Sequence, residues 1–283
     1  VAKWAKILVQ DNSNTAVRQV GDVVENLISQ HGASQIGEEM EGVINPSLKV
    51  WTFDDKLKGQ WANVTVAARK KFSPRNHLYS ITTKSGRQIT VTADHNMVVM
   101  RQGKIRVMRS EAIKLGEAVP LPRTLEATTS SQTLSPAWLT LLGLITSEGL
   151  IYPQYVHICN TDLAVLKIVD DCLTQLNVYH SPLRSQGDHD GYRAGVKFAA
   201  QVIEKGAGGK SGQKRVPPII FSVPKNQAAL YLRAYYEGDG GVDGHSVNAT
   251  TKSKNLASDI AYLLLGFGII ARIHPRFKRA TNT

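Results

Sequence analysis

The sequence has little cysteine and no long apolar run. Its 283 residues include only two cysteines, Cys159 and Cys172, and no metal-ligand spacing surrounds them. This excludes a disulfide framework and a cysteine-ligated metal site, and we expect both thiols to be reduced core residues. No apolar run reaches the roughly 18 residues of a membrane span, and the first residues lack the layout of a signal peptide. We therefore expect a cytoplasmic protein that makes no membrane contact.

Acidic residues are scarce relative to basic ones. The 34 Lys and Arg residues exceed the 23 Asp and Glu residues, which gives a formal net charge of +11 and favours a polyanionic partner. The chain is long enough for two domains. After residue 180 basic residues far exceed acidic ones, and several sit in strand-like segments. A twisted sheet that carries them can lie along a DNA major groove. The alternative for these residues is a solubilising surface.

An acidic residue followed by glycine ends two similar apolar segments. These are LLGLITSEG at 141–149 and LRAYYEGDG at 232–240, with Glu148 and Asp239 at matching positions. A serine and a proline stand before each segment, which is a typical helix start, and glycine is a typical helix stop. The pattern predicts two helices, each ending at its acid.

A carboxylate at a helix C-terminus faces the negative end of the helix dipole. If the two helices pack through Gly143 and Ala234, Glu148 and Asp239 come close together, and a divalent cation would relieve their repulsion. Such a pair is a candidate two-metal phosphodiester site. The alternative is a pair of ordinary amphipathic helices with solvated acids.

The two segments resemble the two signatures of LAGLIDADG homing endonucleases. The resemblance continues through VHICNTD, KRVPPIIFS and residues 251–273, and it covers most of residues 135–280. It implies a metal-dependent enzyme that cuts long asymmetric sites in double-stranded DNA as a monomer. Glu148 and Asp239 would be the catalytic acids and the Mg²⁺ ligands.

The resemblance also implies a basic residue near the scissile phosphate. Lys252 is our first candidate, with Lys254 and Lys214 as rivals, because a cation there would stabilise developing charge. The expected DNA-binding residues are Arg184, Arg193, Lys197, Lys214, Arg215, Arg272, Arg276 and Lys278.

Residues 1–124 have a different pattern. Short alternating stretches separated by polar turns predict an all-β region, with a lone helix at 20–29 and a polar loop at 29–42. The composition of residues 124–135 is that of a linker.

Within this region, GRQITVTADHNMVV places Thr92 three residues before His95. An imidazole with a hydroxyl nearby can protonate a peptide group, although such a pair is commonly an ordinary surface pair. The run resembles the TxxH block of Hint domains, the fold shared by inteins and hedgehog autoprocessing domains, and residues 6–9 and 111–123 support the match. Thr92 and His95 would then assist the N-terminal acyl shift of splicing beside the chain's N-terminus.

The two resemblances together predict a multidomain intein. We expect an all-β Hint horseshoe at 1–125 and an α+β LAGLIDADG endonuclease at 126–283, built from two pseudo-symmetric αββαββα repeats. The repeats would lie at about 135–222 and 223–283, the second C-terminally incomplete. The partners would be double-stranded DNA and flanking host segments (exteins), and splicing would need no cofactor.

The chain departs from an intein at both splice junctions. The chain begins with Val1, and aligning residues 6–9 places the expected nucleophile one residue before it. Neither Asn282 nor Thr283 has the His-Asn context of the second junction, so we expect no splicing from the chain as given. The alternative function is a splicing element whose LAGLIDADG domain is a non-cleaving DNA-binding or structural insertion. A transcription regulator or splicing maturase is a weaker alternative because of the Hint-like half. The presence of both Glu148 and Asp239 favours the endonuclease.

Overall fold

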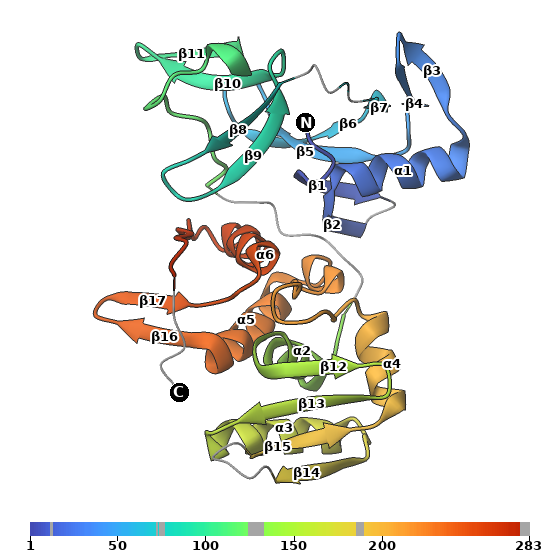
Figure 1. Ribbon diagram of the computed structural model, residues 1–283, viewed down its shortest axis with the longest axis vertical. Helices are drawn as coiled ribbons and strands as arrows, with labels where there is room; N and C mark the ends of the chain where they lie inside the picture. Colours follow the sequence, from blue (N-terminus) through green and yellow to red (C-terminus); the bar gives the residue numbers. More distant parts are fainter. Residues whose placement is uncertain (12–13, 72, 74–76, 124–132, 185–189, 278–283) are drawn as a thin grey trace. The chain divides into compact units, whose positions relative to one another are not determined.

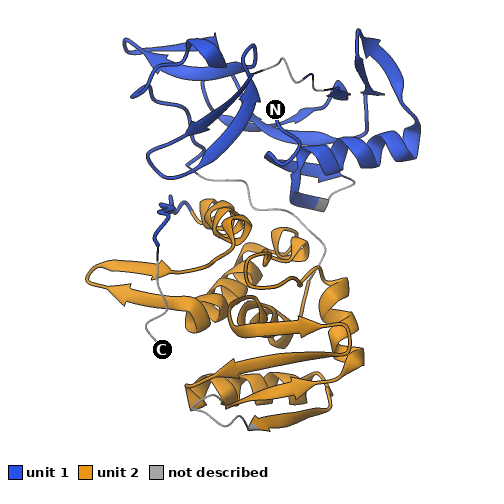
Figure 2. Cartoon of the chain, viewed as in Figure 1, with its two compact units in different colours: residues 1–125, 268–283 blue, residues 126–267 orange. Residues whose placement is uncertain are grey.

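The computed structural model describes residues 1–11, 14–71, 73, 77–123, 133–184 and 190–277 (Figure 1). The chain forms two compact units, one of residues 1–125 and 268–283 and the other of residues 126–267 (Figure 2). The division near residue 125 falls where the linker is predicted. The segment from residue 268 onward, however, groups with unit 1 and not with the predicted endonuclease domain at 126–283.

A backbone contact explains this grouping. The amide of Ile273 donates to the carbonyl of Ser85 at 2.8 Å. The next residue, Gly86, has φ of +78°, and a Cβ there would lie 2.8 Å from the carbonyl carbon of Ile273. Glycine at position 86 therefore serves both the turn and the close approach of the returning chain.

Unit 1 is almost entirely β. Its four-stranded sheet has the order β2-β1-β5-β6, and a three-stranded sheet has the order β3-β4-β7. Two further hairpins pair β8 with β9 and β10 with β11. The strands are β1 (Lys6–Asp11), β2 (Asn14–Gln19), β3 (Ser34–Gly37), β4 (Met40–Ile44), β5 (Lys49–Phe53), β6 (Gly59–Asn63), β7 (Val66–Lys70), β8 (Leu78–Thr82), β9 (Gln88–Thr92), β10 (Asn96–Arg101) and β11 (Lys104–Arg109).

The helix predicted at 20–29 is present as α1 (Val20–His31), and its Val23 packs with Val9 and Leu48 in a buried cluster. The polar loop predicted at 29–42 is wrong, because the end of α1 and the strands β3 and β4 occupy most of it. Gly42 pairs with Ala68 of β7, and a Cβ at position 42 would lie 2.6 Å from the Ala68 Cα. This long-range pairing depends on glycine and leaves no local apolar pattern.

Unit 2 begins with the order helix, strand, strand, helix, strand, strand, helix. These elements are α2 (Pro136–Glu148), β12 (Gly149–Tyr152), β13 (Tyr155–Asn160), α3 (Leu163–Gln175), β14 (His180–Arg184), β15 (Asp190–Ala194) and α4 (Val196–Glu204). The strands form an antiparallel sheet of order β12-β13-β15-β14. The chain continues through η2 (Pro218–Phe221), α5 (Lys225–Asp239), the hairpin of β16 (Gly240–Asp243) and β17 (Ser246–Ala249), and α6 (Lys254–Leu265).

Helices α2 and α5 form the centre of unit 2. Leu139, Leu141 and Ile145 of α2 have no exposed side-chain surface, and neither has Tyr231 of α5. The helix start is the one predicted, since the Ser135 side chain caps α2 by accepting from the amide of Trp138 at 3.3 Å. In the described part of the chain, no helix combines the length and apolar character needed to cross a membrane.

Candidate functional site

The acids Glu148 and Asp239 lie together at one end of the α2–α5 pair. The helices approach through Gly143, where a Cβ would lie 2.6 Å from the Cβ of Ala234. Toward the C-terminal ends of the two helices, a Cβ at Gly238 would lie 2.7 Å from the Ser147 Cβ and 3.0 Å from the Glu148 Cγ. Because Gly238 directly precedes Asp239, this contact brings the two acidic positions side by side. The predicted packing through Gly143 and Ala234 is therefore present.

The glycine after each acid leads the chain straight into a strand. Gly149 and Gly240 both have extended backbone, with φ of −77° and −82°, so neither helix ends in the left-handed residue that a glycine stop suggests. A Cβ at Gly149 would lie 2.6 Å from the carbonyl oxygen of Ile145. Glycine is thus required for close approach to the preceding turn, and each acid stands where a helix becomes a strand.

A buried lysine stands beside the two acids. Lys214 is 8% exposed, and its Nζ donates to the carbonyl of Ser147 at 2.7 Å, at the negative end of α2. Burial lowers the pKa of Lys214, while the charges of Asp239 and Glu148 oppose that shift. Burial raises the pKa of Asp239, and Lys214 opposes that shift in turn. The three groups therefore form one partly desolvated electrostatic cluster.

Helix α6 holds the backbone next to this lysine. The hydroxyl of Ser253, which is 1% exposed, donates to the carbonyl of Lys214 at 2.7 Å and also caps α6 by accepting from the amide of Leu256. Arg215 pairs through Nε with the buried Asp259 of α6 at 3.3 Å. These contacts orient the run around residue 214 so that the lysine points to the acids.

Among the three lysines considered from the sequence, Lys214 is the one that contacts the acid site. Lys252 and Lys254 are exposed, just before and at the start of α6. The choice of Lys252 followed from the sequence alone, whereas the buried position of Lys214 depends on how α6 packs. Lys214 is therefore the better candidate for the basic role.

The predicted DNA-binding residues fall into several places. Arg193 is exposed on β15, and Lys197 is exposed on α4. Arg215 is engaged in the ion pair with Asp259, so its guanidinium serves α6 packing. Arg272 and Arg276 are exposed in the segment that groups with unit 1. The side chain of Arg184 and all of Lys278 lie outside the described residues.

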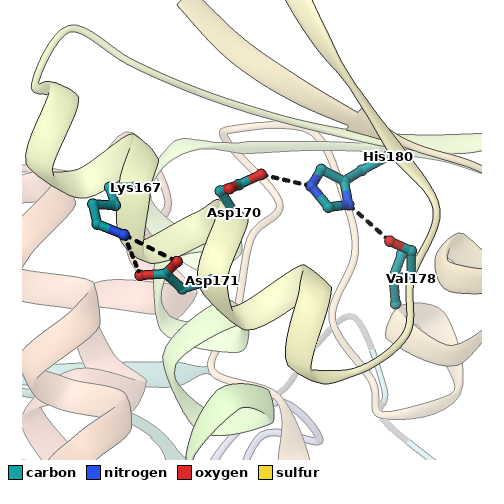
Figure 3. A network of polar contacts seen from close by, with 5 residues as sticks. All are labelled: Lys167, Asp170, Asp171, Val178 and His180. Carbon is teal, nitrogen blue, oxygen red and sulfur yellow. Dashed lines mark hydrogen bonds and ion pairs between the residues drawn. The ribbon is translucent and has the colours of Figure 1, made fainter.

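A polar network that the sequence did not suggest ties α3 to β14 (Figure 3). The ring of His180 lies between Asp170, at 2.8 Å from Nε2, and the carbonyl of Val178, at 2.7 Å from Nδ1. The ammonium of Lys167 bonds Asp171 one turn along the same helix. His180 thus faces α3, which identifies the side of the sheet that the helix covers.

The second predicted site lies in unit 1 at the turn between β9 and β10. The amide of His95 donates to the carbonyl of Thr92 at 3.1 Å, and the amide of Ala2 donates to the carbonyl of Thr90 at 2.9 Å. Burial and the nearby N-terminal ammonium lower the pKa of His95. The turn therefore lies beside the N-terminus, where the resemblance to Hint domains requires it.

Two residues that sequence reasoning missed hold this turn. Ser110 is 3% exposed and donates to the carbonyl of His95 from its amide at 2.8 Å and from its hydroxyl at 2.9 Å. A hydrogen bond from Thr92 lowers the pKa of Asp94. Asp94 stands inside the TxxH run and could have been noticed there, whereas no local signal marks Ser110.

The acid pair of unit 2 fits a divalent cation. Carboxylate oxygens are the hard ligands that such ions prefer, and a magnesium site needs only one or two of them besides water and phosphate oxygens. Burial raises the pKa of Asp239, and a bound cation would favour its ionised form. No group of three or more His, Cys, Asp or Glu suited to a metal occurs among the residues that the structure describes.

Comparisons with known proteins identify a family that matches part of the chain. Residues 226–283 match the family model described as a LAGLIDADG-like domain. Over 95% of its length, the chain is 28% identical to the replication factor C small subunit of Methanocaldococcus jannaschii, of which it covers 14%. It spans less than half the length of the first curated relatives that it matches.

Two kinds of solved structure are similar in part. The Mvu mini-intein of transcription factor IIB aligns over 44% of this chain and 69% of its own, with 17% identity and a TM-score of 0.39. I-DmoI in complex with DNA and Mn aligns over 49% of this chain and 81% of its own, with 16% identity and a TM-score of 0.37. The resemblance drawn from the sequence motifs is confirmed: residues 226–283 match a LAGLIDADG-like domain, and the chain aligns in part with an intein and with the homing endonuclease I-DmoI.

Proposed function

We propose that the chain is an intein whose inserted domain is a site-specific, metal-dependent endonuclease for double-stranded DNA. The observation that carries the proposal is the pairing of Glu148 and Asp239 at the end of the α2–α5 helix pair, with the Lys214 ammonium beside them. An inserted element also explains why nearly the whole chain aligns with a small part of a longer relative.

Glu148 and Asp239 would hold Mg²⁺, which supplies charge stabilisation at the phosphate and activation of the attacking water. Asn160 donates to Glu148 at 3.3 Å and restricts the orientation of that carboxylate. Lys214, anchored on the Ser147 carbonyl, places a fixed positive charge beside the acids, where negative charge develops on the phosphate oxygens. Because the chain itself contributes two acids, a monomer would cut both strands of a long asymmetric site.

The test is cleavage of double-stranded DNA by the Asp239→Asn and Glu148→Gln variants. Each should lose double-strand cleavage and keep DNA binding, because the substituted groups act at the scissile phosphate and other residues make most contacts to the duplex. Unchanged cleavage by Asp239→Asn contradicts the assignment. DNA binding without cleavage by the unaltered chain supports the alternative, a splicing element whose LAGLIDADG domain is a non-cleaving insertion.

A second activity is supported by the position of His95 beside the N-terminus. In a precursor with flanking host segments, Thr92 and His95 would assist the N-terminal acyl shift, His95 by protonating the scissile amide. A precursor with Cys before Val1 should be cleaved there by added thiols, and His95→Ala should abolish that cleavage. Equal cleavage rates in the two precursors would exclude this role.

A further inference from the structure

The sheet of order β12-β13-β15-β14 has one face that its helices leave uncovered. On β13, Val156 and Ile158 are buried, and His180 on the same side of the sheet bonds Asp170 of α3. Side chains alternate along a strand, so Tyr155 and His157 point to the opposite side. Their direct partners in the register are Tyr152 on β12 and Arg193 on β15. We call Tyr152, Tyr155, His157 and Arg193 the open-face cluster.

The cluster is a stack that ends in a guanidinium. The Arg193 guanidinium carbon lies 4.4 Å from the ring centroid of Tyr155, and the Tyr155 ring stacks on His157 at 4.4 Å with 24° between the planes. Tyr152 packs against Tyr155 at 4.7 Å. The aromatic face attracts the cation and restricts its plane, although Arg193 remains exposed. The hydrogen-bonding edge of the guanidinium is therefore presented to solvent.

His157 supports this stack without adding a charge. Burial and the neighbouring Arg193 lower the pKa of His157, which favours the neutral ring. A neutral flat ring can pack behind Tyr155, whereas an imidazolium opposite Arg193 would repel it. The stack therefore carries a single cation at its exposed end.

We propose that Arg193, held against Tyr155, reads a guanine in the major groove of duplex DNA. This inference rests on the proposed function and adds the base that the site recognises. The planar fork of arginine matches the O6 and N7 acceptors of guanine. Because stacking on Tyr155 already restricts the guanidinium, less conformational entropy is lost when Arg193 binds the base.

Duplex DNA is favoured over other anionic partners because the open face begins at the acid pair. Glu148 directly precedes β12, and the nearby Glu148 charge contributes to the raised pKa of Cys159, which lies on the same face as His157. A duplex that brings a phosphate to the acids would thus lie over the cluster. The net charge of +11 supplies the non-specific attraction.

The register sets where the guanine should lie. Arg193 is in register with His157 and, through it, with Leu150, two residues beyond Glu148. Strands are spaced about 4.8 Å apart, so the Cα atoms of Arg193 and Leu150 are separated by about 10 Å. With about 3.4 Å per base pair, the guanine should lie about 3 to 5 base pairs from the cleavage centre.

The experiment selects bound duplexes from a random-sequence DNA library with the full chain in EDTA, where cleavage does not proceed, and sequences them. Arg193→Lys keeps the charge and loses the fork, Tyr155→Leu removes the ring, and Tyr155→Phe keeps it. Arg233→Lys, at an exposed position on α5, is the matched control. The enriched duplex is then offered Mg²⁺ with the unaltered chain to map the cut.

We expect one strongly enriched guanine that Arg193→Lys and Tyr155→Leu both lose, with affinity for the parent's duplex falling about 10- to 100-fold. Tyr155→Phe and Arg233→Lys should keep the guanine. The inference is overturned if Arg193→Lys keeps the preference, if Tyr155→Leu keeps it, or if single-stranded nucleic acid is preferred to duplex. If the unaltered chain does not cut the enriched duplex, the endonuclease proposal is refuted. The binding data would still decide whether Arg193 sets the guanine preference.

Discussion

The two candidate sites are held by opposite means. In unit 2, Glu148 and Asp239 are brought together by two buried helices, and a buried lysine lies beside them. In unit 1, Thr92 and His95 stand in a turn whose geometry is set by backbone hydrogen bonds and by Ser110. The first site depends on side-chain packing between elements far apart in sequence. The second is a turn that is held by hydrogen bonds to its backbone carbonyls.

The two sites also differ in the direction of the pKa shift of their carboxylates. Burial raises the pKa of Asp239, whereas a hydrogen bond from Thr92 lowers the pKa of Asp94. A poorly compensated carboxylate suits a site that recruits a cation, and a satisfied one suits a site that must keep a turn in place. The comparison therefore fits the cation site that we propose in unit 2 and a turn held by hydrogen bonds in unit 1.

The largest expected effect concerns the lysine of unit 2. Lys214→Met should lower the rate of DNA cleavage by about 10²- to 10³-fold, because it removes a fixed charge from a desolvated site. Lys252→Met, at an exposed position, is the control and should stay close to the parent rate. Single-turnover cleavage of the selected duplex measures both. If Lys252→Met lowers the cleavage rate more than Lys214→Met does, Lys252 is the better candidate for the basic residue near the phosphate.

Packing of the helix pair gives the next largest effect. Gly143→Ala should destabilise unit 2 by about 1–3 kcal/mol, because its Cβ would meet the Ala234 Cβ at 2.6 Å. Gly208→Ala is the control, since a Cβ there meets nothing within 4 Å. Urea unfolding followed by hydrogen exchange of unit 2 peptides measures the difference. Equal stability of the two variants would show that the helices do not depend on this approach.

The turn of unit 1 should respond more weakly. Ser110→Ala removes one of two donors to the His95 carbonyl and should cost about 1 kcal/mol. Exchange of the His95 amide should accelerate, while Ser29→Ala, an exposed change in α1, should leave it unaltered. If exchange at His95 is the same in both variants, the turn is held by its own backbone alone.

The smallest effect is a pH dependence of opposite sign in the two sites. The raised pKa of Asp239 means that its stabilising contribution is present in acid and is lost as pH rises above about 4. The lowered pKa of Asp94 means that its contribution is present above about pH 4 and is lost as pH falls. Relative to the parent, Asp239→Asn should gain stability between about pH 4 and 7, and Asp94→Asn should lose it.

Native-state hydrogen exchange, resolved by peptide, measures each unit in its own variant. Asp170→Asn is unsuitable as a control because of its bond to His180, whereas the exposed Asp55→Asn is suitable. If Asp239→Asn and Asp94→Asn change the stability of their units in the same direction, the two sites do not differ in pH dependence as expected.

Local pattern predicted the elements whose causes are local. The start of α2 at Pro136 and its end at Glu148 follow from a capping serine, a proline and a following glycine, and the structure has these bounds. The strands β3 and β4 were missed because their pairing depends on Gly42 fitting against β7, which no neighbouring residue reveals. The same limit explains the preference for Lys252, since sequence spacing does not show which lysine is buried.

The sequence by itself determined the ends of the two central helices and the acids that stand there. The serine cap of α2, the prolines at the start of both helices and the glycines after both acids act over a few residues. It also marked Thr92 and His95 through the resemblance of their run to the TxxH block of Hint domains. Only the tertiary structure decided that Lys214 lies beside the acids, that Ser110 holds the His95 carbonyl, and that Arg193 stacks on Tyr155. These contacts join residues distant along the chain, and packing across helices and strands, not local propensity, selects them.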